Sequence, residues 1–252
     1  MVEYSEHFYK SVTSRALTAS EVIANTLLQN CNPNSIIDIG AGDGSWIVTL
    51  ASKSEAKRLI AVDLPGSNFE SIKNSNKTIE VQTIDFEQEM IQNGEPYDLA
   101  ICVEVIEHIS SDRALRLLDW MSENCRAIIF SGATPGQGGT HHINEQSQSY
   151  WIGSMSKRGF IPIDNMRPQL INNKKVASYY RNNIFLYINS RYINEAYIVE
   201  LLKESITQDS FIFKDIRNSL EKITHKIVSL LPVKVVTYIA EIKSRLEIVQ
   251  KP

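Results

Sequence analysis

The sequence predicts an α/β fold in which a parallel β-sheet is covered by helices. From residue 34 to residue 189, short apolar runs alternate with amphipathic segments, as expected when helices connect parallel strands. The first apolar run leads straight into a glycine-rich turn, which is a frequent ligand-binding feature of such sheets. A chain of 252 residues with 43% hydrophobic and 22% charged residues can form one domain of this class with appendages.

Seven apolar runs have the length of buried strands and are bounded by turn-forming residues. These candidate strands are Ser35–Ile39, Arg58–Val62, Ile79–Thr83, Tyr97–Val103, Arg126–Ser131, Phe160–Ile163 and Ile184–Asn189.

Amphipathic helices are expected before and between these strands. An N-terminal helix over Ala16–Asn30 opens the domain, and further helices are expected over Ser45–Lys53, Ser111–Asn124 and Ser147–Arg158. Gly159 follows the last of these and is a natural terminating glycine. The segment Gly132–Thr140 is rich in glycine and is expected to form an irregular loop next to an active site.

The chain changes character after Asn189. We therefore divide it into a domain at residues 1–190 and a C-terminal helical appendage at residues 191–252. The appendage contains three helical segments, Tyr192–Leu202, Ile212–Leu231 and Val233–Val249, with Pro232 between the last two. Amphipathic helices usually pack on protein, so a contact with the core or with a second copy in a homodimer is expected. A peripheral contact with a membrane surface or a lipid-linked substrate is the alternative.

Composition narrows the range of partners and compartments. The formal net charge of −3 gives no general attraction to polyanions, so a nucleic acid is not the expected partner. Cys102 and Cys125 lie in or beside apolar strands and are expected to be buried reduced thiols. The N-terminal residues do not form a secretory signal, and no run reaches the roughly 18 apolar residues that span a bilayer. A cytoplasmic location is expected.

The turn after the first strand is the strongest motif in the chain. Residues 35–44 form an apolar strand followed by glycines at alternating positions, Gly40, Gly42 and Gly44, and a helix begins near Ser45. Glycine accepts backbone conformations that other residues avoid, and it allows a ligand to lie against the main chain. The spacing differs from the G-x-G-x-x-G pattern of dinucleotide sites.

An acidic residue two positions before the first glycine indicates the charge of the ligand. The carboxylate of Asp38 would repel a pyrophosphate, whereas it would attract the ammonium and sulfonium groups of S-adenosylmethionine (SAM). The charge pattern therefore favours SAM over a dinucleotide.

The D-x-G-x-G-x-G pattern resembles motif I of class I SAM-dependent methyltransferases, and the resemblance continues in order from Ala16 to Asn189. It implies a Rossmann-like fold with a doubly wound, mostly parallel, seven-stranded sheet. It also implies an acid for the ribose hydroxyls after the second strand, an adenine contact after the third, and a methionine contact after the fourth. The implied cofactor residues are Asp38, Gly40, Ala41, Gly42, Gly44, Asp63, Leu64, Asp85, Phe86 and Glu104. Taken singly, Asp63 could cap a turn and Asp85 could be a solvated loop residue.

A candidate metal site follows the fourth strand. Side chains at i, i+3 and i+4 of a helical turn share a face, so Glu104, Glu107 and His108 can converge. With His142, or His141, they would form a mixed carboxylate–imidazole site for Mg²⁺, Mn²⁺ or Zn²⁺. The E-x-x-E-H pattern resembles both small-RNA 3′-end 2′-O-methyltransferases and ubiquinone-pathway O-methyltransferases, so it does not select a substrate. The alternative is that Glu107 and His108 only shape the turn.

The loop histidines are candidate catalytic bases. Imidazole titrates near neutral pH, so His141 or His142 could accept the proton of an acceptor hydroxyl. Residues 138–146, followed by Tyr150 and Trp151, resemble small-molecule and sugar methyltransferases, and this resemblance favours His142. In the alternative interpretation, Asn144 caps a helix and the two aromatic residues belong to the core.

The sequence therefore predicts a SAM-dependent O-methyltransferase that acts on a small-molecule or glycan acceptor, such as a sugar, a glycan precursor or a phenol. One alternative is methylation of the 2′-hydroxyl at an RNA 3′ end. Another is a non-catalytic SAM-binding module that uses the C-terminal helices as its interface.

Overall fold

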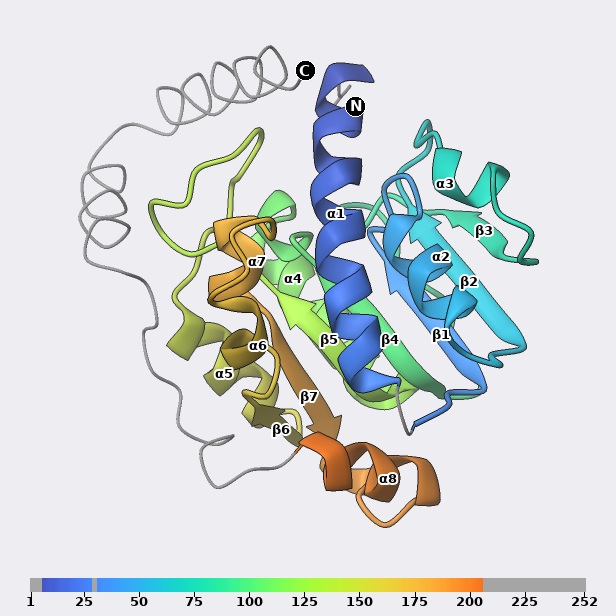
Figure 1. The fold of residues 1–252 in the computed structure, drawn as a ribbon. Coiled ribbons are helices and arrows are strands. Elements are labelled where there is room, and N and C mark those ends of the chain that lie inside the picture. The colour runs from blue at the N-terminus through green and yellow to red at the C-terminus, as the bar shows by residue number, and fades with distance from the viewer. Residues whose placement is uncertain (1–5, 29–30, 206–252) are drawn as a thin grey trace.

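The computed structural model describes residues 6–28 and 31–205, in which a seven-stranded sheet lies between two layers of helices (Figure 1). The strands are β1 (Ser35–Ile39), β2 (Arg58–Asp63), β3 (Glu80–Thr83), β4 (Tyr97–Val103), β5 (Cys125–Ser131), β6 (Phe160–Ile163) and β7 (Phe185–Asn189). The α-helices are α1 (Glu6–Leu27), α2 (Ser45–Ser52), α3 (Glu70–Lys73), α4 (Ser111–Asn124), α5 (Gln148–Ser156), α6 (Arg167–Leu170), α7 (Ser178–Asn183) and α8 (Ala196–Ser205). Two 3₁₀ turns are η1 (Ile106–His108) and η2 (Ser190–Tyr192).

The strand order is β3-β2-β1-β4-β5-β7-β6. Strands β1 to β5 pair in parallel, whereas β7 runs antiparallel to both β5 and β6. This confirms the expected mostly parallel, doubly wound sheet. The order reverses between β1 and β4, and ligands of such sheets bind beyond the carboxyl ends of the strands at this point.

Alternate side chains of each strand enter separate cores on the two faces of the sheet. On one face, Ile36 and Leu99 pack with residues of α1, α2, α6, α7 and α8. On the other face, Ile37 and Ala100 pack with residues of α4 and α5. Both faces are thus covered, which explains why the strands appear as almost continuous apolar runs in the sequence.

The predicted elements agree with the structure to within one or two residues, except at α1 and after β7. Helix α1 begins at Glu6, ten positions before the predicted start at Ala16. The single helix predicted over Tyr192–Leu202 is instead the 3₁₀ turn η2 followed by α8. The predicted helices Ile212–Leu231 and Val233–Val249 lie outside the described residues.

Two smaller predictions are confirmed. Gly159 has a φ of 86° and is the last residue of the turn that follows α5. Cys102 and Cys125 are buried, and neither forms a disulfide.

Among the helices of residues 6–28 and 31–205, none combines the length and the apolar character needed to cross a bilayer.

Candidate functional site

The glycine loop joins β1 to α2 in a conformation that glycine alone adopts without strain. The φ angles of Gly40, Gly42 and Gly44 are 73°, 59° and 87°. A Cβ atom at Gly40 would lie 2.3 Å from a methyl carbon of Val105, and one at Gly44 would lie 2.3 Å from Ile72. A Cβ atom at Gly42 would meet no heavy atom of the described residues within 4 Å. Two glycines therefore serve internal packing, and the middle one faces open space where a ligand could approach.

The end of β2 is bonded to this loop. The backbone N–H groups of Gly40 and Ala41 both donate to the carbonyl of Val62, at 2.8 Å and 3.0 Å. The Oδ2 atom of Asp63 accepts the N–H of Gly42 at 2.5 Å, and its Oδ1 atom accepts the N–H of Leu64 at 2.6 Å. The predicted cofactor residues of β1 and β2 thus form one connected unit.

Three carboxyl groups at the loop, those of Asp38, Asp43 and Asp63, lie close enough to repel one another. Asp38 is 2% exposed, and burial raises its pKa to about 8, with Asp63 and Asp43 adding to the shift and a hydrogen bond from the N–H of Ile47 opposing it. Burial also raises the pKa of Asp63, against the hydrogen bonds that it accepts. A positively charged ligand would relieve this repulsion, because it stabilises the ionised carboxylates.

Asp43 was not predicted as a site residue, although it joins three helices at the loop. Its carboxylate accepts the hydroxyl of Thr13 of α1 at 2.9 Å, that of Ser45 of α2 at 2.7 Å and that of Ser71 at 2.7 Å. Two of these partners lie about 30 positions away in the sequence, so no local spacing pattern could reveal them.

The segment after β3 contains Asp85 and Phe86, the predicted adenine contacts. Phe86 is buried, as an apolar ring contact requires. The carboxylate of Asp85 accepts the N–H of Glu87 at 3.0 Å and the side-chain amide of Gln88 at 2.8 Å, so it caps a local turn. Its role toward adenine stays a prediction.

The turn after β4 places Glu104 beside Glu107, although Glu104 is not part of the most compact group of candidate metal ligands. Glu104 has a φ of 57° and precedes the 3₁₀ turn η1, so the regular helical turn expected from this residue does not form. The hydroxyl of Ser131 donates to its Oε1 atom at 2.7 Å, and the side-chain amide of Gln137 donates to its Oε2 atom at 2.5 Å. Burial raises the pKa of Glu104, with these hydrogen bonds acting in the opposite direction.

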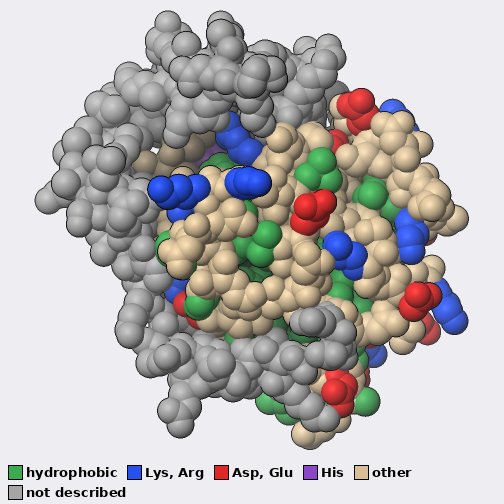
Figure 2. All heavy atoms as spheres, viewed as in Figure 1, with side chains coloured by type: hydrophobic (Ala, Val, Ile, Leu, Met, Phe, Trp, Pro, Cys, Tyr) green, Lys and Arg blue, Asp and Glu red, His purple; other side chains and the backbone are tan. Residues whose placement is uncertain are grey.

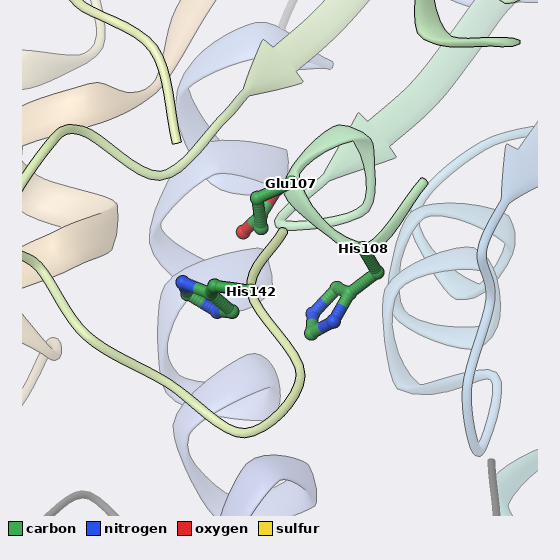
Figure 3. Close-up of side chains that lie close together, drawn as sticks. All are labelled: Glu107, His108 and His142. Carbon is green, nitrogen blue, oxygen red and sulfur yellow. The ribbon is translucent and has the colours of Figure 1, made fainter. Parts of the chain in front are cut away.

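Glu107, His108 and His142 form a compact cluster (Figure 3). One carboxylate oxygen and one nitrogen of each imidazole all lie within 4.8 Å of one another. Glu107 and His108 come from the turn η1, and His142 comes from the loop after β5. The structure therefore groups three of the four predicted metal ligands.

Burial shifts the pKa values of Glu107 and His108 in this cluster toward their uncharged forms. Glu107 is 0% exposed, and burial together with the nearby Glu104 raises its pKa well above the ordinary range. Backbone N–H groups of Glu107 and Ala133 and the carboxyl of Glu104 face its carboxylate, yet among the described residues neither oxygen has a well-formed hydrogen bond. Burial and the neighbouring His142 lower the pKa of His108 to about 3, so its imidazole is neutral in ordinary buffers.

The two loop histidines have different surroundings. His141 is exposed and has a φ of 60°. The Nδ1 atom of His142 lies 2.8 Å from the Oε1 atom of Glu145, and the imidazole ring of His142 lies 4.9 Å from that of His108. His142 therefore belongs to the cluster. His141 contributes no ligand atom to it, although the backbone of His141 is hydrogen-bonded to the side chain of His108.

Asn144 anchors the loop and does not cap the following helix, which corrects one interpretation of the sequence. The N-cap of α5 is Ser147, whose hydroxyl accepts the N–H of Tyr150. The side chain of Asn144 instead donates to the carbonyl of Ile106 at 3.2 Å and accepts the hydroxyl of Ser111 at 2.8 Å. Trp151 is buried in the core, as that interpretation expected.

A profile of the methyltransferase domain family matches residues 4–134, just over half of the chain. The chain belongs to this family. It carries a class I SAM-dependent methyltransferase domain, and the match includes the glycine loop, Asp63, Asp85 and the turn η1. The matched segment ends before His142 and Glu145.

One similar protein is a ubiquinone biosynthesis O-methyltransferase of Rickettsia typhi, which is 32% identical over 122 residues. That match covers 47% of this chain and 44% of the relative, so the chain matches less than half of the length of that relative.

Solved structures share the fold at low identity. The magnesium protoporphyrin IX methyltransferase of Synechocystis, with bound SAH, superposes with a TM-score of 0.54 at 16% identity, over 75% of this chain and 90% of that one. A small RNA methyltransferase superposes with a TM-score of 0.54 at 14% identity, over 68% of this chain and 25% of that one.

Proposed function

We propose that this chain transfers the methyl group of SAM to an oxygen atom of a small polar acceptor, such as a sugar, a glycan precursor or a phenol. The O-methyltransferase name of the Rickettsia relative supports the choice of oxygen. The observation that carries the proposal is the cluster of Glu107, His108 and His142, because a hydroxyl acceptor needs a group that removes or masks its proton.

The residues around the glycine loop would hold the cofactor. Gly42 leaves room for SAM against the main chain, and Asp63 at the end of β2 would accept the hydroxyls of the ribose. The acidic group of Asp38, Asp43 and Asp63 would stabilise the positive charges of the methionine part of SAM through its net negative potential.

The cluster also fits a divalent cation. A buried carboxylate without a well-formed hydrogen bond is costly unless a ligand compensates it, and Glu107 has this property among the described residues. Two imidazoles beside one carboxylate suit Zn²⁺ or Mn²⁺ better than Mg²⁺, which prefers an all-oxygen shell. Glu107, His108 and His142 would hold the ion, and Glu104 is the next carboxylate nearby. A bound ion would supply Lewis-acid stabilisation of an ionised acceptor hydroxyl.

His142 has two roles open to it, metal ligand or general base. As a base, its imidazole would accept the acceptor proton while Glu145 holds the ring in place. Metal dependence separates the two roles.

The test uses the full chain with a labelled methyl donor and panels of sugars and phenols, with and without chelator. We expect SAM-dependent labelling of at least one class, and a loss of about 100-fold or more on His142→Ala. Loss of activity on chelation, restored by Mn²⁺ or Zn²⁺, assigns His142 as a ligand, whereas chelator-insensitive activity assigns it as the base. Cofactor binding without turnover on either panel contradicts the proposal and favours the non-catalytic module.

A second candidate acceptor is the 3′ end of an RNA, because Glu107 and His108 of the E-x-x-E-H pattern lie together with His142. The net charge of −3 argues against it, and Figure 2 shows basic and acidic side chains together on one face. Binding of a short RNA that weakens steeply with added salt would support this candidate.

A further inference from the structure

Glu145 joins the two halves of the loop after β5 through one carboxylate. Its Oε2 atom accepts the N–H of Gly136 at 2.9 Å, and its Oε1 atom accepts the N–H of Gly138 at 2.9 Å. Both glycines have a positive φ, of 86° and 70°, which lets two nearby N–H groups point to the same acceptor. The loop is also closed at its base, where the N–H of Gln146 donates to the carbonyl of Ala133 at 3.1 Å.

The same Oε1 atom contacts His142. It lies 2.8 Å from Nδ1 of the imidazole, and the two side chains are only 20% and 11% exposed. An ionised carboxylate can only accept hydrogen bonds, so the proton of a neutral His142 must be on Nδ1. The lone pair is then on Nε2, the nitrogen that remains for a proton or a metal ion.

Gly139, the residue after Gly138, packs against the imidazole ring of His142. A Cβ atom at Gly139 would lie 2.1 Å from Nε2 of His142, so the ring packs directly against the loop backbone. The imidazole is thus held between the carboxylate of Glu145 on one side and the main chain of Gly139 on the other.

We propose that Glu145 is a positioning residue, which closes the glycine-rich loop and fixes the tautomer that His142 presents to the reacting groups. This inference rests on the proposed function for the identity of the reaction only. The contacts of Glu145 and His142 that carry it lie within residues 136–145, after the segment that matches the family, which ends at residue 134. Glu145 itself is not expected to touch the acceptor.

The test is an NMR experiment on the full chain labelled with ¹⁵N. At mildly alkaline pH, long-range ¹H–¹⁵N correlations distinguish an imidazole protonated on Nδ1 from one protonated on Nε2. Free neutral imidazole side chains favour the proton on Nε2, so an Nδ1–H form at His142 is a specific signature. The chain has five histidines, and His142→Asn identifies the signals of His142 by their loss.

We expect the wild-type chain to show the Nδ1–H form at His142 and Glu145→Ala to lose it. In the same variant, exchange of the amide hydrogens of Gly136 and Gly138 should accelerate at least about tenfold, because two charge-assisted hydrogen bonds disappear. In His142→Asn the two glycine amides should stay protected, since Glu145 still accepts them. Glu89→Gln, which neutralises an exposed carboxylate between β3 and β4, is the matched control and should change neither signal.

Glu145→Gln provides a milder variant. Glutamine keeps the shape of the side chain but has a single acceptor oxygen, so it can retain only part of the three contacts. We expect an intermediate increase in glycine amide exchange and a mixture of tautomers at His142.

An Nε2–H form in the wild-type chain, or an unchanged Nδ1–H form in Glu145→Ala, would overturn the inference. Neither readout requires an acceptor, a cofactor or a metal. A chain that passes this test and methylates no acceptor would contradict the proposed function alone, and a chain that methylates an acceptor with an Nε2–H His142 would contradict this inference alone.

Discussion

At the scale of one residue, Asp38 leads to a prediction about the charge of the bound ligand. Its carboxyl is buried under the glycine loop, with two further acids nearby, and its pKa is about 8. An acid with a raised pKa binds more protons in the folded state than in the unfolded state. Its contribution to the free energy of unfolding is therefore fully present below about pH 4 and is lost as the pH rises toward about 8.

This property predicts that cofactor binding depends on pH. The positive charges of SAM favour the ionised form of Asp38, so binding below pH 8 should release a proton. We expect the affinity for SAM to rise with pH between about 6 and 8, by at most about tenfold per pH unit. Calorimetry in buffers of different ionisation enthalpy measures the released proton. Asp38→Asn should flatten the pH dependence, and an equally steep dependence in that variant would contradict the assignment.

The glycines of the loop differ in what an alanine would do. At Gly40, alanine would combine a positive φ with a clash against Val105, so a loss of more than about 2 kcal/mol in the free energy of unfolding is expected. At Gly42, only the backbone cost of roughly 1–2 kcal/mol is expected, but the new methyl group would project into the space proposed for SAM.

Gly42→Ala should therefore affect the affinity for SAM much more than the free energy of unfolding. Gly40→Ala should affect the free energy of unfolding more than the affinity for SAM. Urea unfolding and calorimetric titration of the two variants, each compared with Gly66→Ala, check this. Gly66 also has a positive φ and open surroundings. Equal affinity of Gly42→Ala and Gly66→Ala for SAM would show that no ligand lies against Gly42.

At the scale of elements, the connection between β6 and β7 depends on a buried ion pair. Arg167 is 0% exposed, its Nε atom donates to Asp164 at 2.8 Å, and its guanidinium lies 4.2 Å from the ring centre of Phe185. Its Nη1 atom also donates to the carbonyl of Asn182 at 3.2 Å, at the end of α7. The adjacent Asn183 links α7 to the loop after β5, because its side-chain amide donates to the side-chain oxygen of Gln137 at 2.6 Å.

Removing one partner of this pair leaves a buried charge uncompensated. We expect Asp164→Ala to lower the free energy of unfolding by about 3–5 kcal/mol, as measured by urea denaturation. The double variant Asp164→Ala with Arg167→Met should recover most of the loss, because both charges are then gone. Additive losses in the double variant would show that the two side chains act independently.

The sequence predicts most elements of this fold because each strand is an apolar run bounded by turns, and packing on both faces keeps those runs uninterrupted. It misses the first turns of α1, where residues 6–15 are polar and aromatic without a clear helical periodicity. It also misses the 3₁₀ turn η2 after β7, which is fixed by the side chain of Asn189 accepting the N–H of Arg191 at 3.2 Å.

The site is predicted in part for a related reason. Gly40, Gly42, Gly44, Asp38 and Asp63 are local to strand ends, so their spacing shows in the sequence. Asp43, Gln137 and Glu145 act through contacts that only the folded chain brings together. The helical spacing of Glu104 and Glu107 suggested that they share a face of a regular helical turn. Glu104 instead has a left-handed conformation, and its carboxylate accepts the hydroxyl of Ser131 while it still interacts with the side chain of Glu107.

For the whole molecule, ligand binding should appear as thermal stabilisation. A ligand at about 100 times its dissociation constant adds roughly 2.7 kcal/mol, which raises the melting temperature of a chain of this size by about 5–10 °C. SAM and S-adenosylhomocysteine should give this shift, whereas NAD should not, because the acidic group under the loop repels its pyrophosphate. Differential scanning calorimetry measures it. A larger shift with NAD would contradict the cofactor assignment.

The loops after β4 and β5 share a joint at the main chain of Glu107. Its carbonyl oxygen accepts the N–H groups of both Ile143 and Asn144, at 2.9 Å and 3.1 Å. These two hydrogen bonds link the loop that carries the carboxylate of Glu107 to the loop that carries the imidazole of His142. A displacement of either loop should therefore move both side chains. Substitutions in the two loops should consequently show strong thermodynamic coupling rather than additive effects, and evolution or engineering of this pocket would have to change both segments together.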